Sequence, residues 1–339
     1  MEFFGVALFS SLSGSTLTMV CGVMFVIGLV AIIKGGDWFV DSASWFASAT
    51  GIPKFIVGAT IVSFATTLPE MIVSIRAAMN GSTQLAIGNA IGSVTANTTL
   101  IMGVSLIFMA SAISRKSFAL KGIMFLSAAV SLTVISVACG LILPIWSVAI
   151  LGAIFLIFMI DNIKQGKDFA EQDEIDSFEK KELPGKIILF ILGTAGIVLG
   201  AELLVGSGQT IATNMGISEA IIGFTVIALG TSLPELVTTL TAIKKKEASL
   251  SVGNIIGANV IDLTLILPVC AIASGEALPV ELVNVMLDFP VCIIAAAIAV
   301  IPTIIKGKFM KWQGFTLLVM YFAYMACLVL NEYGILAIG

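Results

Sequence analysis

The sequence predicts an all-α membrane protein with ten transmembrane helices, arranged as two inverted repeats of five helices each. Three observations carry this prediction: the chain is too apolar for a water-soluble protein, its apolar segments have the length of a bilayer span, and two motifs recur at one fixed spacing. Apolar residues make up 58% of the 339 positions, charged residues make up 11%, and the mean hydropathy is +1.11. Such a composition fits a protein whose solvent is the bilayer.

Glycine, proline and charged residues divide the chain into segments of at least the roughly 20 apolar residues that span a hydrocarbon core. The predicted helices cover residues 16–47, 53–79, 82–110, 117–138, 143–163, 185–213, 217–243, 247–272, 280–305 and 310–331. The first and sixth are longer than a perpendicular span requires, so we expect both to tilt.

One long polar stretch separates a first repeat, residues 1–163, from a second repeat, residues 185–339. This stretch, residues 164–184, holds seven of the 21 acidic residues. It lacks the glycine and the ligand spacing of an EF-hand calcium loop. We therefore interpret it as a solvated cytoplasmic linker.

Two motifs occur twice, and a single shift of 165 residues aligns both pairs. Residues 58–70 match residues 223–235, and residues 88–100 match residues 253–265, with six of 13 positions identical in each pair. A fixed internal spacing indicates duplicated structural units. Because each half holds an odd number of helices, the second half must enter the membrane in the opposite orientation, as in many secondary transporters.

The basic residues predict how the chain is oriented. With the amino terminus outside, the loops expected in the cytoplasm and the adjoining helix ends carry 15 of the 17 Lys and Arg residues, all except Lys34 and Arg76. Cytoplasmic loops of membrane proteins are enriched in these residues. We expect a multi-pass protein of the plasma or inner membrane with both termini extracytoplasmic.

The acidic residues inside predicted helices include Glu70, Glu235 and Asp262. A carboxylate at bilayer depth costs on the order of 3 kcal/mol or more unless it is paired or binds a cation, so these residues are functional candidates. Each glutamate follows a proline, which cannot donate to the carbonyl four residues earlier, at Ala65 or Gly230. The alternative for each proline and glutamate is a helix kink with a snorkelling side chain.

Further oxygen-bearing side chains follow the same helical pattern. The hydroxyl residues on the same helix side as one of the two glutamates are Ser63, Thr66, Thr67, Thr231 and Ser232.

The Gly-Asn-x-x-Gly segments open the third and eighth helices, and each leads to a polar residue 27 positions after a glutamate. These two residues are Asn97 and Asp262, at equivalent positions of the repeats. Ser93 precedes Asn97 by one helical turn, whereas its counterpart is Ala258, so the site is asymmetric. An interhelical polar clamp is the alternative role for Asn97 and Asp262.

Together these residues offer carboxylates, a carboxamide, hydroxyls and freed carbonyls, but no soft ligand. Roughly six to eight hard oxygen ligands suit calcium, and subsets of them suit sodium. The chain contains no histidine, which excludes His-ligated zinc sites, His-based nucleophilic triads and imidazole proton relays. An empty site with three carboxylates should be costly to occlude, which favours cation exchange over leak. We expect calcium and sodium as transported ions and no cofactor.

The two motif pairs resemble the alpha repeats of the calcium/cation antiporter superfamily, and within it the compact prokaryotic sodium/calcium exchanger branch. Residues 65–70 with 88–92, and 230–235 with 253–257, carry this resemblance. It implies Glu70 and Glu235 as central calcium ligands, overlapping sodium and calcium sites, and sliding of the first and sixth helices across the core. The residues implied around the two glutamates are Thr66, Thr67, Ser93, Asn97, Thr231, Ser232 and Asp262, with main-chain oxygen expected from Ser63 and Ala228.

The chain departs from this pattern at two places. Ala258 stands where such exchangers usually carry serine, which puts one sodium site and the stoichiometry in question. Ser63 and Ala228 differ from each other where small residues are expected. Asp262 resembles an acid of potassium-dependent exchangers, but prokaryotic members share it, so potassium cotransport does not follow. Proton/calcium exchangers tend to place a glutamate just after Gly-Asn, and this chain has apolar residues there, which favours sodium.

Three other classes of protein remain open at this point. A proton-coupled calcium or other divalent-cation exchanger would use Asp262 to exchange protons, and sodium dependence discriminates it. A cation channel would line a continuous pore with these acids, although duplicated proline-broken helices favour a transporter. An intramembrane hydrolase would need an aspartyl pair or a Ser-Lys dyad, and we predict no enzymatic activity. Membrane lipid is an expected partner, nucleic acid is not, and a site within one chain predicts a functional monomer.

Overall fold

The computed structural model describes residues 14–109, 115–170, 182–214 and 230–336, and almost all of them are helical. The helices are α2 (Gly14–Thr50), α3 (Lys54–Val57), η1 (Gly58–Val62), α4 (Ser63–Thr66), α5 (Leu68–Met79), α6 (Thr83–Ala96), η2 (Asn97–Ile101), α7 (Met102–Met109), α8 (Arg115–Ala138), α9 (Ser147–Ala170), α10 (Leu183–Asn214), α13 (Leu233–Lys245), α14 (Ala248–Ile261), η4 (Asp262–Ile266), α15 (Leu267–Ser274), η5 (Asn284–Asp288), α16 (Phe289–Lys306) and α17 (Lys311–Glu332). Two short strands, β1 (Ile142–Leu143) and β2 (Leu278–Pro279), pair antiparallel with Leu143 opposite Leu278.

Eight helices among the described residues are long and apolar enough to cross a membrane, and a bent pair formed by residues 54–66 and 68–79 makes a ninth. The prediction of a helical membrane protein is confirmed by these spans. The predicted helix at residues 217–243 lies partly outside the described residues, because only α13 represents it. The total of ten helices therefore stays a prediction.

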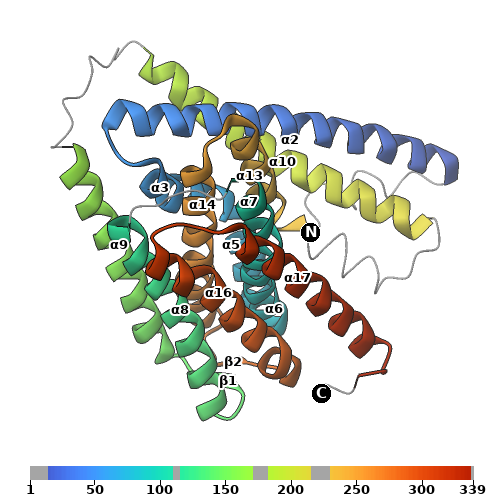
Figure 1. Cartoon of the computed structure of the whole chain (residues 1–339). Coiled ribbons are helices and arrows are strands. Elements are labelled where there is room, and N and C mark those ends of the chain that lie inside the picture. Colours follow the sequence, from blue (N-terminus) through green and yellow to red (C-terminus); the bar gives the residue numbers. More distant parts are fainter. Residues whose placement is uncertain (1–13, 110–114, 171–181, 215–229, 337–339) are drawn as a thin grey trace.

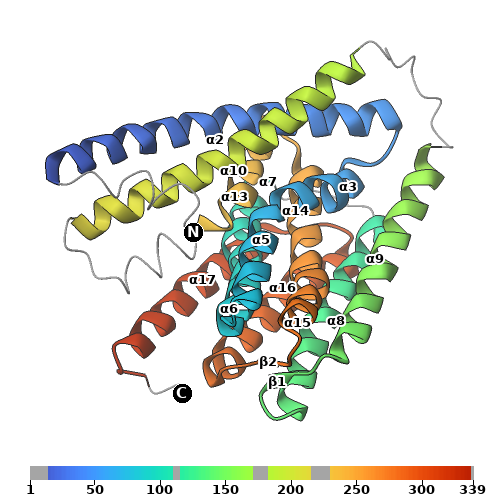
Figure 2. The ribbon, with the colours of Figure 1, turned by 180° about the vertical axis from the view of Figure 1, so that it is seen from behind.

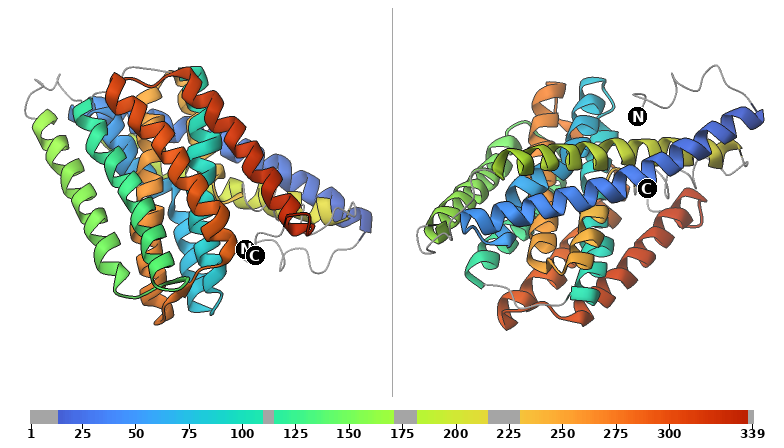
Figure 3. Two further views of the ribbon diagram at one scale, coloured as in Figure 1. Left: turned by 60° about the horizontal axis from the view of Figure 1, so that its bottom comes forward. Right: turned by 90° about the horizontal axis from the view of Figure 1, so that it is seen from above.

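The two longest helices, α2 and α10, lie side by side across one end of the other helices (Figures 1 and 2). Seen from above in Figure 3, they cross over the central helices. Glycines let their backbones approach closely: a Cβ at Gly28 would collide with the Gly200 carbonyl, and one at Gly35 with the Gly193 carbonyl. Small residues at such crossings are typical of helix packing in membranes.

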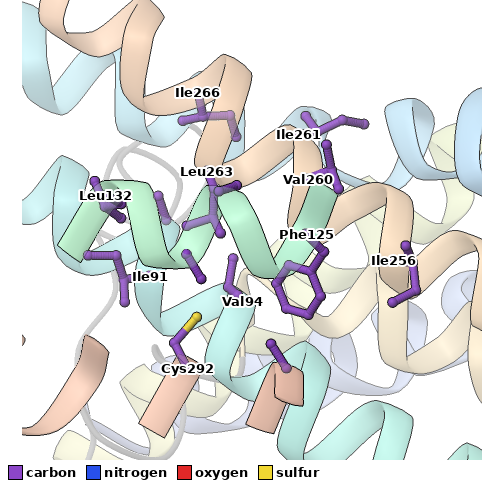
Figure 4. Packing of buried hydrophobic residues seen from close by; sticks show 14 of the residues in the cluster. Ile91, Val94, Phe125, Leu132, Ile256, Val260, Ile261, Leu263, Ile266 and Cys292 are labelled. Atoms are coloured by element: carbon purple, nitrogen blue, oxygen red, sulfur yellow. The ribbon is translucent and has the colours of Figure 1, made fainter. Parts of the chain in front are cut away.

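The centre of the molecule is formed by two continuous helical rods that begin at residues 83 and 248. The first consists of α6, η2 and α7, and the second of α14, η4 and α15; every boundary of the second lies 165 residues after that of the first. Figure 4 shows how buried apolar side chains of these rods, among them Val94, Val260 and Leu263, pack with Phe125 of α8 and Cys292 of α16. The motif spacing seen in the sequence is thus also a spacing of structural elements.

Two details differ from the predicted elements. The predicted helix at residues 53–79 is interrupted at Thr67, where the chain bends by 47°. Helix α9 continues to Ala170, so the first part of the polar stretch at residues 164–184 is helical. Hydropathy marks where a helix leaves the bilayer, whereas a polar helix can continue beyond that point.

Candidate cation-binding site

Two helices begin inside the molecule, and each carries a predicted site glutamate in its first turn. Helix α5 starts directly after the break at Thr67 and carries Glu70, and α13 carries Glu235 at the equivalent position. Pro69 and Pro234 lie in the first turn of these helices, where a missing N–H leaves no helical hydrogen bond unmade. The positive end of each helix dipole therefore faces a carboxylate and stabilises its charge.

The polar residues at the second motif lie where the central rods change their helical geometry. The π-helical turn η2 begins at Asn97, and the turn η4 begins at Asp262. A π turn changes the direction of side chains relative to an α-helix and is frequent at functional sites. Asn97 and Asp262 therefore occupy the same distinctive backbone position in the two rods.

All three predicted acids are buried. The exposed fraction is 1% for Glu70 and 0% for Glu235 and Asp262. Among the described residues, no hydrogen-bond partner is found for either oxygen of Glu70, for either oxygen of Asp262, or for Glu235 Oε2. The main-chain N–H of Glu70 approaches its own carboxylate without reaching hydrogen-bonding geometry. Buried polar atoms are normally paired, so this group of unpaired oxygens is a strong departure from ordinary packing.

Neutral oxygens of the predicted set share this environment. Asn97 Oδ1 and Ser232 Oγ are buried and unpaired within the described part of the chain. The hydroxyls of Ser93 and Thr231, which come from different repeats, lie 3.5 Å apart. These atoms are electron-pair donors of the kind that hard cations bind.

The two repeats also meet at Glu235. The Thr67 hydroxyl oxygen lies 3.4 Å from Glu235 Oε1, and the Thr66 hydroxyl lies beside the same carboxylate. Glu70 is close enough to Glu235 and Asp262 for their charges to repel. Residues from both repeats therefore contribute to one buried, negatively charged region.

Of the two predicted main-chain ligands, Ser63 and Ala228, the structure describes Ser63, and its carbonyl is already hydrogen-bonded. The Ser63 carbonyl already accepts the Thr67 hydroxyl at 2.7 Å and the Thr67 N–H at 2.9 Å. Ser63 is itself buried, and its hydroxyl donates to the Thr60 carbonyl at 3.0 Å. Ala228 lies outside the described residues.

The acids are not drawn together into a compact metal cluster. Within the described ranges, no group of three Asp, Glu, Cys or His side chains has the proximity of a ready-made metal site. Mutual repulsion between carboxylates opposes such a cluster when no cation is bound. Cation binding would have to draw the acids closer together than they lie in this structure.

Sequence reasoning missed two kinds of polar residue. The motif asparagines Asn89 and Asn254 were given no role, yet Asn89 Nδ2 donates to Ser74 Oγ at 2.9 Å, and Asn254 contacts Thr66. Their identical place in both repeats was the available signal. A further buried acid, Asp288, accepts hydrogen bonds from Asn284 and Tyr324, and its place inside the predicted helix at residues 280–305 was the available signal.

Comparison with known proteins identifies similar chains over nearly the full length. The profile described as sodium/calcium exchanger protein matches residues 21–162 and 185–330. An uncharacterized membrane protein of Methanocaldococcus jannaschii is 31% identical over 90% of this chain and 96% of its own. The sodium/calcium exchanger MaX1 of Methanosarcina acetivorans is 29% identical over 90% of this chain and 97% of its own. A solved structure of the sodium-calcium exchanger NCX_Mj superposes with a TM-score of 0.81 at 30% identity, covering 91% of this chain and 99% of the other.

Proposed function

The chain belongs to the sodium/calcium exchanger protein family, and from this membership we propose that it is a secondary antiporter that exchanges sodium for calcium across a membrane. Sodium and calcium are the transported substrates in this proposal, and no resident cofactor takes part. The chain is a transporter rather than an enzyme, as are the exchangers it resembles.

The observation that carries the proposal is the set of buried carboxylate oxygens without hydrogen-bond donors. Five of the six oxygens of Glu70, Glu235 and Asp262 are unpaired among the described residues. An unpaired buried charge costs several kcal/mol, so a structure that retains three such groups requires a compensating partner. A bound cation is the partner that their oxygen chemistry fits.

We assign Glu70 and Glu235 as the central ligands, because they lie in the first turns of matched helices of the two repeats and are close enough for their charges to repel. We assign Asp262 and Asn97, which begin the two π turns, as further ligands. The hydroxyl ligands assigned around them are Thr66, Thr67, Ser93, Thr231 and Ser232, and the main-chain oxygens of Ser63 and Ala228 complete the proposed set. The Ser63 carbonyl would have to release the Thr67 hydroxyl in order to bind an ion.

An inverted repeat is supported by the packing of α2 against α10. Gly28 approaches Gly200 and Gly35 approaches Gly193, so the helices run antiparallel. A shift of 165 residues turns Gly28 into Gly193 and Gly35 into Gly200, so each contact is converted into the other. Contacts of this reciprocal kind are expected from a pseudo-two-fold axis, and antiparallel membrane helices place that axis in the membrane plane. We propose that this symmetry provides two alternating orientations of access to one site.

We also propose an orientation of the chain in the membrane. Basic residues at the carboxyl end of α13, Lys244, Lys245 and Lys246, and at the end of α16, Lys306, face the cytoplasm in the proposed topology. Both termini are then extracytoplasmic, in the plasma or inner membrane. One chain contains the whole proposed site, so a monomer suffices for transport.

Calcium-45 uptake into proteoliposomes tests the function. The vesicles would be loaded with sodium, with potassium, or with an acidic buffer, and would contain the wild type or Glu235→Gln, with Glu276→Gln as a charge-matched exposed control. We expect uptake only from the outward sodium gradient, lost in Glu235→Gln and kept in the control. Uptake driven by internal acid would establish proton coupling instead, and flux independent of any gradient would exclude exchange.

A further inference from the structure

Asn254 lies on α14 in line with two residues of the proposed site. Asn254, Ala258 and Asp262 follow one another at intervals of four residues, so they share one side of the rod. Asn254 is fully buried, and its Oδ1 lies 3.1 Å from the Thr66 hydroxyl oxygen of the opposite repeat. Its Nδ2 is buried and has no hydrogen-bond partner among the described residues.

In this orientation of the Asn254 amide, hydrogen-bond donors and acceptors around Thr66 do not match in number. The single hydroxyl proton of Thr66 faces three acceptors: Asn254 Oδ1, the Ser63 carbonyl at 3.3 Å, and the Glu235 carboxylate. Meanwhile the two amide protons of Asn254 have no acceptor within the described part of the chain, and a buried unsatisfied donor costs about 1–3 kcal/mol. A half-turn of the carboxamide exchanges nitrogen and oxygen in nearly the same positions. Nδ2 then donates one proton to Thr66 Oγ1, which gives that proton an acceptor and leaves the Thr66 proton two acceptors in place of three.

We propose that Asn254 is a positioning residue for cation binding, which donates from Nδ2 to the Thr66 hydroxyl and so fixes the direction of that hydroxyl's remaining lone pair. With one lone pair occupied by Asn254, the Thr66 hydroxyl donates a hydrogen bond to Glu235 when no ion is bound. When a cation binds Glu235, the Thr66 hydroxyl turns its proton away from that carboxylate, and the second lone pair of Thr66 faces the ion. The proposal rests on the proposed function only in placing Thr66 among the cation ligands.

The equivalent asparagine of the first repeat does not have this role. Asn89 Nδ2 donates to Ser74 Oγ at 2.9 Å and to the Glu70 carbonyl at 3.4 Å, and neither acceptor is assigned as a ligand. Asn89 is also only partly buried. The same motif residue therefore supports a helix in one repeat and orients a ligand in the other, which makes Asn89 a matched control.

Calcium binding to the purified protein tests the proposal independently of the coupling ion. The calcium concentration that gives half of the maximal rise in melting temperature would be measured for Asn254→Leu, Thr66→Val, the double variant, and Asn89→Leu alone and with Thr66→Val. If Asn254→Leu does not fold, Asn254→Ala makes the same comparison because it also removes the donor. Wild-type sodium-driven uptake, measured separately, tells a failure of the exchange function from a failure of this proposal.

Loss of one hydrogen bond of about 1 kcal/mol corresponds to about fivefold weaker calcium binding for Asn254→Leu. Because Asn254 acts through Thr66, adding Asn254→Leu to Thr66→Val should weaken calcium binding by less than twofold further. Asn89→Leu should lower the melting temperature without changing the half-saturating calcium concentration, with either residue at position 66. The proposal is overturned if the effects of Asn254→Leu and Thr66→Val multiply independently. It is also overturned if Asn254→Leu lowers only the melting temperature.

Discussion

Replacing Glu235 with glutamine removes one charge from the proposed site and nearly preserves the shape of the side chain. Glu235 is fully buried, its Oε2 is unpaired within the described residues, and its Oε1 is contacted by Thr67 at 3.4 Å. Without ions, this carboxylate is repelled by Glu70 and Asp262. The neutral amide can instead donate to those acids. We therefore expect Glu235→Gln to stabilise the ion-free protein by about 1–3 kcal/mol.

The same substitution should weaken calcium binding. Removing one partner of a buried charge interaction costs about 3 kcal/mol or more, which corresponds to about 100-fold in affinity. At a calcium concentration 100 times the wild-type dissociation constant, calcium should stabilise the wild type by about 2.7 kcal/mol. A variant that binds 100-fold more weakly would gain only about 0.4 kcal/mol.

Thermal unfolding of the purified protein in detergent, with and without calcium, measures both effects. Glu276→Gln makes the same chemical change at an exposed position and should behave as the wild type. If Glu235 is a cation ligand that lacks a partner without ions, Glu235→Gln should raise the melting temperature in the absence of ions. It should also reduce the rise in melting temperature that calcium causes. If Glu235→Gln melted lower without ions and kept the full calcium response, Glu235 would be a structural residue and the reasoning would be refuted.

Three further substitutions test other parts of the account. Ala258→Ser supplies the hydroxyl that the first repeat carries at the equivalent position. It should lower the half-saturating sodium concentration for calcium efflux by about two- to tenfold. An unchanged sodium concentration would show that position 258 is not part of the sodium site. Gly253→Ala places a Cβ against the main chain of α3, so it should lower the melting temperature by the equivalent of about 3 kcal/mol. The control Gly152→Ala meets no described atom within 4 Å and should leave the melting temperature unchanged. Equal effects of the two substitutions would contradict the close helix contact at Gly253. Lys121→Met leaves Asp161 without its 2.8 Å ion-pair partner and should destabilise the protein by about 2 kcal/mol. Adding Asp161→Leu to Lys121→Met should restore most of this stability. If the two substitutions destabilised the protein additively, the pair would not be coupled.

Much of the fold could be predicted because helix ends marked by charged residues, breaks marked by proline, and the repeat spacing can all be read directly from the sequence. The start of α14 at Ala248 follows a run of lysines, and the break at Thr67 precedes Pro69, whose missing N–H is visible in the sequence. The fixed spacing of 165 residues predicted that Asn97 and Asp262 would share one backbone position. Burial of the acids followed from the apolar segments that contain them.

The remaining features depend on contacts between distant segments. No local pattern marks the π turns at Asn97 and Asp262, since the flanking residues are ordinary helix formers for a membrane protein. The different bonding of Asn89 and Asn254 could not be predicted either, because their sequence motifs are the same and only the opposite helix differs. The hydrogen bond from Tyr324 to Asp288 could not be predicted, because the two residues are 36 positions apart.

The central claim is that one set of buried oxygens binds sodium or calcium, but not both at full occupancy. Equilibrium binding of calcium-45 to the purified wild-type protein, titrated with sodium or with potassium at constant ionic strength, tests it most directly. The account predicts that sodium displaces calcium and potassium does not, and that Glu235→Gln weakens the sodium-sensitive binding about 100-fold. Calcium that stayed bound at saturating sodium, or that potassium displaced equally well, would contradict a shared site for the two exchanged ions.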